Sequence, residues 1–550
     1  MHNKQGKKGT LNKVEKETLC MISNDVASGK KIVGVAAYGS QVANYATEDS
    51  DYDIIVALED YAPKVKYRYI KAELEISALL VDKETLIADA QRASLGEFVA
   101  GRMLNIYLPL SGKKFFKEVE NIIKKRVIVE ALNEIGSSLG EFSEEIRIPV
   151  EYFLFDKLKK RASIYPPVLY SYAKTYGDDL IVENTEAACR GFLDALKDLE
   201  VNGLIILENG LVRIIDNKSK RWTTILSGMI KYTQRGLTQY AVHGYAGRVG
   251  INIISKEVMS KISRVRKGYE TPELIKNPKN LWRLDEGDLI VGEEGWLEKV
   301  LDHFQLVGKV STSKDNIGDA YSASKVYSAR DKERKVKFIV KRYADIKAVK
   351  WVALNIWALM SKRFDMSPIS RLSREYSSLK KFRELGINTP KVLVVAFNQR
   401  ILVTEFIEGL DLGDVLSKIL KGEKNMLKYI KSYGEELGKV HKSGYTLGDT
   451  KPSNSIVSNG KIFLIDLEQV AEDGDPGWDI AEFIYYSSKL TLDVESAKQL
   501  TSKFLDGYLE YGEKDSVGES LKLKYLAPFQ PILAPNVVAG VRRVIKKRTE

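Results

Sequence analysis

The chain has 550 residues and a net charge of +11; 44% of its residues are hydrophobic and 29% are charged. Because single hydrophobic cores stop growing at about 250 to 300 residues, this length predicts several domains. Only two cysteines, Cys20 and Cys189, and four histidines are present, which excludes a disulfide framework and a structural zinc cluster, so a metal should have oxygen ligands. The most apolar run, residues 351–360, is half of the roughly 20 residues that a membrane-spanning helix needs, and the basic N-terminus lacks an apolar signal segment. We therefore expect a cytoplasmic protein without a membrane span.

A polar loop near the N-terminus separates two predicted strands, residues 31–38 and 52–58, and begins with Gly39 and Ser40. A glycine lets the backbone approach a phosphate closely, and the amide and hydroxyl of a serine can donate hydrogen bonds to it. The loop is therefore a candidate phosphate site, although a plain polar turn would have the same composition.

Acidic residues follow on this strand and on the next predicted one. Asp51 and Asp53 are two residues apart, so the pleat of the strand directs both carboxylates to one face. Their repulsion is relieved if a divalent cation such as Mg²⁺ lies between them. The next strand, residues 72–81, brings Glu73 and Glu75, and either could complete a cage of three carboxylates.

The Gly-Ser pair, the two aspartates and an acid on the next strand together resemble the nucleotidyltransferase superfamily of DNA polymerase β. The resemblance implies that Asp51 and Asp53 bind two metal ions, and that Gly39 and Ser40 hold a nucleoside triphosphate. It also implies that the third acid assists the second metal and the attacking hydroxyl. We assign this position to Glu75, which apolar residues flank on both sides, and the other glutamate remains the alternative.

The middle of the chain, residues 84–195, is predicted to be mainly helical, and one helix should run from Thr185 to Gly203. The pair Asn209-Gly210 then predicts a two-residue hairpin turn. Helices followed by a hairpin resemble a winged helix, a module that often binds nucleic acid, and the basic residues 218–221 come directly after the hairpin. A packing or dimerisation module is an equally good interpretation.

The C-terminal half carries a second set of polar residues. Lys341 lies in a predicted strand, and Glu375 lies beside the apolar stripe of the following helix, where it could point inward and pair with that lysine. Asp449 and Asn454 share a later loop, and Asp466 lies at the end of a strand that follows an Asn-Gly hairpin turn. This combination of acids, an amide and a lysine suits metal-dependent phosphoryl transfer.

In this order, the five residues resemble the eukaryotic-protein-kinase-like superfamily over residues 300–550, especially its RIO, Bud32 and aminoglycoside-phosphotransferase branches. The resemblance implies that Lys341 binds the α- and β-phosphates of ATP and pairs with Glu375. It also implies that Asp449 is the catalytic base, and that Asn454 and Asp466 bind Mg²⁺.

The same resemblance places Glu405 in the hinge that grips adenine, and Gly318 in the loop that covers the phosphates. The sequence departs from the family because no arginine precedes Asp449, because Asp466-Leu467-Glu468 replaces the usual Asp-Phe-Gly, and because no Ala-Pro-Glu segment is present. Control by phosphorylation of an activation loop is therefore not expected, and a catalytically inactive ATP sensor is the alternative interpretation.

These patterns predict an α/β and α+β multidomain protein. Residues 1–110 should form a nucleotidyltransferase domain around a small mixed sheet, and residues 111–295 a helical and winged-helix-like middle region. Residues 296–550 should form a two-lobed protein-kinase-like domain, with its lobes at 296–406 and 407–550.

The predicted function is that of a Mg²⁺-dependent transferase with two heads, which uses ATP or another nucleoside triphosphate, with Mn²⁺ as an alternative metal. A nucleotidyltransferase head would move a nucleoside monophosphate, and a RIO/Bud32-like kinase tail would move a γ-phosphate. The candidate partners are RNA, tRNA in particular, or a protein substrate. One alternative is an RNA-binding factor of tRNA or ribosome maturation whose kinase fold is an ATP-dependent switch. Another is a regulatory pair in which one head modifies or silences the other.

Overall fold

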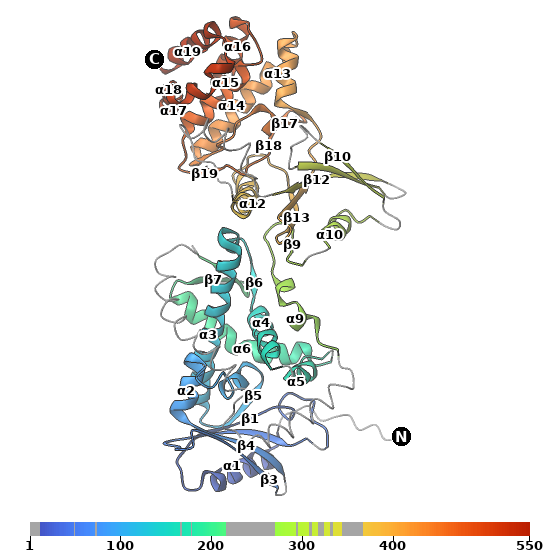
Figure 1. Cartoon of the computed structure of the whole chain (residues 1–550), viewed down its shortest axis with the longest axis vertical. Helices are drawn as coiled ribbons and strands as arrows, with labels where there is room; N and C mark the ends of the chain where they lie inside the picture. Colours follow the sequence, from blue (N-terminus) through green and yellow to red (C-terminus); the bar gives the residue numbers. More distant parts are fainter. Residues whose placement is uncertain are drawn as a thin grey trace. The chain divides into compact units, whose positions relative to one another are not determined.

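The structure is a computed structural model that divides into two compact units, Met1–Arg283 and Leu284–Glu550 (Figure 1). It describes residues 11–48, 50–71, 74–165, 168–177, 179–215, 270–292, 295–306, 311–316, 324–330, 334–343 and 367–550. Several predicted features lie outside these ranges: Glu73, Gly318 and the basic residues 218–221.

The first unit contains a five-stranded sheet in the order β3-β4-β2-β1-β5. Its strands are β1 (Ile32–Tyr38), β2 (Tyr52–Leu58), β3 (Val65–Lys71), β4 (Glu75–Asp82) and β5 (Tyr107–Ser111). The sheet is mixed, because β2 and β4 run parallel and the other neighbours run antiparallel. β1, β2 and β4 confirm the predicted strands, whereas β3 is an additional edge strand whose lysines and arginine obscure its apolar pattern.

Helix α1 (Lys13–Ala27) covers one face of this sheet. The core on that face combines residues of the helix with alternate residues of β1, β2 and β4, among them Leu19, Val26, Val35, Ile54, Val56, Ile76 and Ala78. Tyr52 points to the same face, where its hydroxyl donates a hydrogen bond to Glu15 at 3.0 Å. Since side chains alternate along a strand, Asp53 lies on the other face. Asp51 precedes β2 and accepts a hydrogen bond from Ser77, the residue that pairs with Asp53, so both aspartates lie beside the same residue of β4.

The remainder of the first unit is mainly helical. Its longer helices are α2 (Lys83–Arg92), α3 (Lys113–Leu139), α4 (Val150–Ile164), α5 (Val168–Thr175) and α6 (Ile181–Val201). Its shorter ones are η1 (Ala100–Leu104), η2 (Gly140–Glu144), α9 (Glu273–Lys276) and η3 (Pro278–Leu281). Thr185 lies inside α6 rather than at its start, because Leu180 occupies the N-cap position.

A small sheet in the order β6-β8-β7 packs with these helices. It consists of β6 (Ile148–Pro149), β7 (Ile205–Glu208) and β8 (Leu211–Ile214). The turn residues Asn209 and Gly210 have φ values of 52° and 76°, which the two central positions of a type I′ turn require. The predicted hairpin is therefore confirmed.

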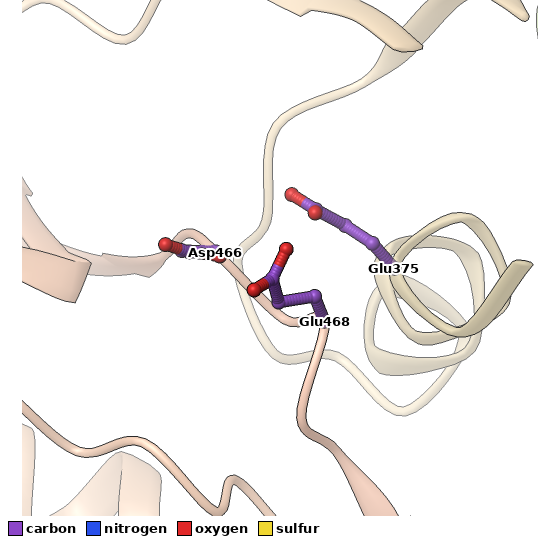
Figure 2. Close-up of side chains that lie close together, drawn as sticks. All are labelled: Glu375, Asp466 and Glu468. Carbon is purple, nitrogen blue, oxygen red and sulfur yellow. The ribbon is translucent and has the colours of Figure 1, made fainter. Parts of the chain in front are cut away.

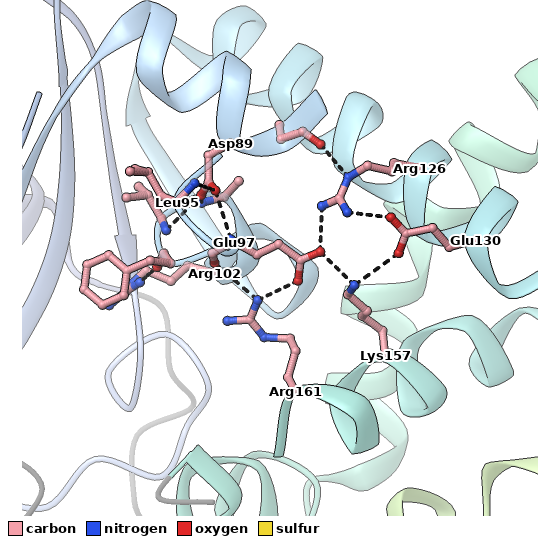
Figure 3. Close-up of polar contacts among 12 residues, drawn as sticks. Asp89, Leu95, Glu97, Arg102, Arg126, Glu130, Lys157 and Arg161 are labelled. Carbon is pink, nitrogen blue, oxygen red and sulfur yellow. Dashed lines mark hydrogen bonds and ion pairs between the residues drawn. The ribbon is translucent and has the colours of Figure 1, made fainter. Parts of the chain in front are cut away.

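A buried charge cluster joins the segment before η1 to α3 and α4 (Figure 3). The Glu97 carboxylate lies 2.6 Å from Arg126, 2.7 Å from Lys157 and 3.0 Å from Arg161. On α2, the buried Asp89 carboxylate accepts hydrogen bonds from four backbone amides between residues 95 and 100. The two carboxylates together hold η1 in a defined position beside the sheet.

The second unit begins with a six-stranded sheet in the order β10-β11-β12-β14-β13-β9. Its strands are β9 (Asp288–Ile290), β10 (Ser311–Asn316), β11 (Ser324–Arg330), β12 (Lys335–Arg342), β13 (Val392–Ala396) and β14 (Ile401–Glu405). Residues 284–292, which the prediction assigns to the middle region, lie in this unit, because β9 pairs with β13 and Glu286 accepts a hydrogen bond from the Val392 amide at 2.7 Å. The other predicted domain boundaries remain predictions.

Helices α10 (Trp296–His303) and α12 (Pro368–Glu384) accompany this sheet. α12 begins after Ser367, whose hydroxyl caps the helix, and Pro368 occupies its first turn. The predicted apolar stripe of α12 is confirmed, since its members are buried: Leu372, Tyr376, Leu379 and Phe382.

The rest of the second unit is mainly helical and carries two small sheets, β15-β17-β18 and β16-β19. Its strands are β15 (Leu410–Asp411), β16 (Tyr445–Thr446), β17 (Ser455–Ser458), β18 (Lys461–Leu464) and β19 (Ala471–Glu472). Its helices are α13 (Leu412–Leu420), η4 (Lys424–Met426), α14 (Leu427–Lys442), η5 (Pro452–Asn454), α15 (Pro476–Ser488), α16 (Val494–Tyr508), α17 (Lys514–Glu519), α18 (Leu523–Leu526), η6 (Ala527–Ile532) and α19 (Pro535–Thr549). Within the described part of the chain, none of the helices is long and apolar enough to cross a membrane.

Candidate active sites

The first candidate site lies where β1 ends and β2 begins. Gly39 follows β1 with a φ of +82°, and a helical turn begins there, since the Ala43 amide donates to the Gly39 carbonyl at 3.0 Å. A Cβ atom on Gly39 would collide with Oδ2 of Asp53. The backbone conformation therefore favours glycine, and a larger residue would also displace the Asp53 carboxylate from its present position.

The two aspartates sit among polar neighbours on the adjacent strands. Asp53 pairs in register with Tyr38 on β1 and with Ser77 on β4. Asp51 accepts a hydrogen bond from the Ser77 hydroxyl at 2.5 Å. The sequence reasoning missed Ser77, although its spacing from Glu75 places it on the same face of β4.

Glu75 is less closely integrated than the two aspartates. It lies at the start of β4, its side chain is 62% exposed, and it forms an ion pair with Lys71 at 3.0 Å. Among the described residues, the one group of three acidic side chains with ligand oxygens within 4.8 Å of one another lies in the second unit. The structure therefore does not bring Glu75 together with Asp51 and Asp53 in this way, and its metal-binding role remains a prediction.

A buried arginine lies near this site. The Arg102 guanidinium on η1 lies 5.0 Å from the centre of the Tyr38 ring and donates a hydrogen bond to the Tyr67 hydroxyl at 2.5 Å. Burial acts to lower the pKa of Arg102, but Tyr38, Tyr67 and Asp53 raise it. A permanent positive charge is thus held near Asp53, where it can offset negative charge on the carboxylates or on a phosphate.

The second candidate site is built around Lys341 on β12. Its amine lies 2.6 Å from Glu375 on α12 and 2.5 Å from Asp466, which follows β18. A third carboxylate, that of Glu468, lies 3.2 Å away. Figure 2 shows the three carboxylates converging from α12 and from the segment after β18. The predicted pairing of Lys341 with Glu375 is confirmed.

The pKa values in this cluster follow from burial opposed by ion pairing. Burial acts to lower the pKa of Lys341, but Asp466 and Glu375 raise it well above its ordinary value. Burial raises the pKa of Glu375 to about 7 against the opposing effect of Lys341. Burial acts to raise the pKa of Asp466 as well, but Lys341 keeps it below the ordinary value. The lysine and Asp466 are therefore ionised at neutral pH.

The predicted base lies in the loop between β16 and β17. Oδ2 of Asp449 forms an ion pair with Lys451 at 2.9 Å. The side-chain amide of Asn454 donates a hydrogen bond to the backbone carbonyl of Asp449 at 3.2 Å. Within the described residues, Oδ1 of Asp449 is buried and has no hydrogen-bond partner. This oxygen can accept a proton from a hydroxyl group.

Helix α15 holds this loop in place. The fully buried Asp479 accepts hydrogen bonds from the amides of Leu447 at 2.6 Å and Gly448 at 2.8 Å, and its carboxylate lies 3.1 Å from His441. One turn later, Glu482 accepts from the Thr450 amide at 2.8 Å. Glu482 could not be recognised from the sequence, because nothing in its local pattern distinguishes it from a surface glutamate.

The carboxylate oxygens around Asp466 are suitable ligands for Mg²⁺, which prefers oxygen. Asp466 has a left-handed backbone with a φ of +59°, which is uncommon for a residue other than glycine and often marks a functional position. Asn454 is joined to the same segment, since its backbone carbonyl accepts a hydrogen bond from the backbone amide of Ile465 at 2.9 Å. The assignment of Asp466 and Asn454 as ligands of the ion remains a prediction.

Glu405 lies at the end of β14, in the predicted hinge. Its amide and its carboxylate both bond to the backbone of Lys391, at 3.0 Å each. The side chain therefore stabilises the start of β13, and its predicted contact with adenine remains a prediction.

Comparison with known proteins identifies two domains. Residues 22–98 match the family model described as "Polymerase beta, Nucleotidyltransferase", and residues 325–481 match the model described as "RIO domain".

Among curated proteins, a KEOPS complex subunit Bud32 from Pyrococcus abyssi is 38% identical over 96 residues, which are 18% of this chain and 43% of that protein. A probable serine/threonine-protein kinase BUD32 homolog from Archaeoglobus fulgidus is 31% identical over 157 residues, which are 28% of this chain and 73% of that protein. A probable bifunctional tRNA threonylcarbamoyladenosine biosynthesis protein from Methanocorpusculum labreanum is 31% identical over 140 residues, or 25% of this chain and 24% of that protein. The chain thus spans less than half of the Pyrococcus relative.

The fold and the two sites define a protein with a nucleotidyltransferase domain at its N-terminus and a kinase-like domain at its C-terminus. Through the kinase-like domain, the chain belongs to the RIO/Bud32 family of kinases.

Proposed function

We propose that this protein is a Mg²⁺-dependent transferase with two active heads, one a nucleotidyltransferase and the other a RIO/Bud32-like kinase. The observation that carries the proposal is the Lys341–Glu375–Asp466 cluster. An ion-paired lysine beside a carboxylate that fits Mg²⁺ is what binding of a nucleoside triphosphate requires. A cytoplasmic location belongs to the same proposal, because both reactions draw on nucleoside triphosphates.

In the kinase tail, Lys341 would bind the α- and β-phosphates of ATP while Glu375 fixes its position. Asp449 would take the proton of the acceptor hydroxyl through Oδ1, as the hydroxyl oxygen bonds to the γ-phosphorus. The bond from the γ-phosphorus to the bridging oxygen breaks, and ADP leaves. Asp466 and Asn454 would hold Mg²⁺, and the ion would supply positive charge to offset that of the phosphates.

In the nucleotidyltransferase head, Gly39 and Ser40 would hold the triphosphate, and the acidic residues would hold the metal: Asp51, Asp53 and either Glu75 or Glu73. The third acid would take the proton of an acceptor hydroxyl as the hydroxyl oxygen bonds to the α-phosphorus. The bond from the α-phosphorus to the bridging oxygen would break, and pyrophosphate would leave. Arg102 supports this assignment, because a buried cation beside Asp53 favours the binding of additional negative charge.

Two radioactive labels test the two heads separately. The full chain is incubated with Mg²⁺ and ATP labelled at either the α- or the γ-phosphate, together with cell extract fractionated into RNA, protein and metabolites. We expect transfer of the α-label that Asp53→Ala abolishes and transfer of the γ-label that Asp466→Ala abolishes. If neither label moves to any fraction, the two-headed transferase is wrong.

A second candidate function is that of an RNA-binding factor in tRNA maturation, with the kinase fold as an ATP-dependent switch. It is favoured by the similarity to a probable tRNA threonylcarbamoyladenosine biosynthesis protein and by the β7–β8 hairpin, which resembles the wing of a winged helix. This function predicts that tRNA binds with an affinity that falls steeply with salt. An affinity that does not depend on salt, or no binding, would exclude it.

A further inference from the structure

We propose that Glu468 is a positioning residue of the kinase tail, which holds Lys341 in parallel with Glu375 and ties it to α12 through Arg371. The inference rests on the proposed kinase function and extends it to a residue to which neither the sequence pattern nor the comparisons assign a role. Glu468 stands where the usual Asp-Phe-Gly segment has a glycine, so it adds a carboxylate where that segment has no side chain.

Lys341 has a limited number of hydrogen-bond donors, and its carboxylate neighbours compete with a phosphate for them. A lysine ammonium has three N–H donors. In this structure three carboxylates surround the amine, those of Glu375 at 2.6 Å, Asp466 at 2.5 Å and Glu468 at 3.2 Å. When Asp466 serves the metal and the nucleotide binds, one donor becomes available for a phosphate oxygen. The hydrogen bond to Glu375 and the ion pair with Glu468 then hold the amine from two sides, which limits the directions in which it can donate to the phosphate.

Glu468 is itself held in place by two arginines. Its other carboxylate oxygen pairs with Arg371 at 3.5 Å, and its backbone carbonyl accepts a hydrogen bond from Arg374 at 3.2 Å. Both arginines are on α12, within one turn of Glu375. Lys341 is therefore tied to α12 twice, directly by Glu375 and indirectly by Glu468 and Arg371.

This double attachment gives Glu468 a specific role in the reaction. In kinases, the pairing of the strand lysine with the helix glutamate must be in place for phosphoryl transfer. Here the contacts of Glu468 with Lys341 and Arg371 hold α12 close to Lys341. Phosphorylation of a loop is then not needed to keep the two together. Glu468 acts through Lys341 and does not itself contact the reacting atoms.

Equilibrium binding of nucleotides provides the test, because it needs no acceptor substrate. Mg²⁺ with AMP-PNP, and separately adenosine, are titrated calorimetrically into the full chain carrying Asp53→Ala, so that the nucleotidyltransferase head does not contribute. In this background Glu468→Gln should weaken AMP-PNP binding about tenfold, the scale of losing one close contact between charged groups, and leave adenosine binding unchanged. Weaker binding of both AMP-PNP and adenosine would indicate a general structural defect and would overturn the positioning role.

Arg371→Gln should weaken AMP-PNP binding as well, and the double variant should bind no more weakly than Glu468→Gln alone, because both residues act through one contact. Should Glu468→Gln fail to fold, Arg371→Gln carries the test. Glu495→Gln on α16 is the matched control, since this glutamate is 79% exposed and pairs with Lys498 at the surface, and it should have no effect.

The outcomes separate this inference from the function on which it rests. If the Asp53→Ala chain with Glu468 intact does not bind AMP-PNP, the kinase function fails and this proposal falls with it. If that chain binds AMP-PNP and Glu468→Gln binds it equally or more tightly, the kinase function stands. Glu468 would then be an unfavourable negative charge near the phosphates, and the positioning role would be wrong.

Discussion

Replacing Glu97 by glutamine should destabilise the first unit far more than an ordinary loss of charge. The Glu97 side chain is 7% exposed and lies between 2.6 and 3.0 Å from three cations, those of Arg126, Lys157 and Arg161. A neutral amide cannot balance three positive charges, and Arg126 is itself almost fully buried. Removing one partner of a buried ion pair typically costs about 3 to 5 kcal/mol, and we expect a loss of this size.

Amide hydrogen exchange read by mass spectrometry can localise the effect, because peptides from the second unit serve as an internal reference. A loss of 3 to 5 kcal/mol corresponds to exchange that is about a hundredfold faster or more in the protected amides of α3 and α4. The matched control is Glu134→Gln, since Glu134 is 56% exposed in its ion pair with Lys160 and should contribute less than about 1 kcal/mol.

The dependence on pH has a defined sign. Burial acts to raise the pKa of Glu97, but Lys157, Arg126 and Arg161 keep it well below the ordinary value of 4.5. A lowered folded-state pKa means that the stabilisation is present above the unfolded value and is lost as the pH falls through the folded one. The protection of α3 and α4 should therefore fall in acid more steeply in the native protein than in Glu97→Gln. If Glu97→Gln exchanges no faster than Glu134→Gln at neutral pH, the reasoning on this cluster is refuted.

Three further predictions concern the two sites. Gly39→Ala should abolish α-label transfer and leave γ-label transfer intact, because its Cβ would collide with Asp53; retained α-transfer would show that this close approach is not needed. Asp479→Asn should reduce γ-label transfer at least tenfold, since it weakens the acceptor for two loop amides, and unchanged transfer would rule out this support of the base. Glu482→Gln should stabilise the second unit at high pH. Burial and Asp449 raise the pKa of Glu482 to about 8, so its ionisation lowers the stability of the native protein as the pH rises from 4.5 to about 8. Thermal unfolding of the native protein and of Glu482→Gln at pH 5 and pH 8 checks this prediction. An equal change in unfolding temperature between the two pH values for both proteins would contradict it.

The features that the sequence predicted correctly depend on short-range geometry. Asp51 and Asp53, two residues apart, both lie beside Ser77 of β4, as strand alternation predicts, and the Asn209-Gly210 hairpin follows from the φ values that its turn requires. The pairing of Lys341 with Glu375 was predicted from a helical stripe together with a family resemblance.

The features that were missed depend on contacts between distant segments. Arg102 reaches Tyr38 and Tyr67 only because η1 folds back against the sheet, and Glu97 meets Lys157 only after α3 and α4 are in place. Glu468 was noted as a departure from the family, but its contact with Lys341 spans more than a hundred residues of chain. Hydrophobic periodicity carries no information about such polar contacts.

The number of nucleotide sites on one chain tests the central claim most directly. Mg²⁺ and a non-hydrolysable ATP analogue are titrated into the full chain and into the variants Asp53→Ala, Asp466→Ala and the two combined. The account predicts two sites on the native chain, one on each single variant and none on the double variant. A single site that only one of the two substitutions removes would contradict it, because one of the heads would then not bind nucleotide.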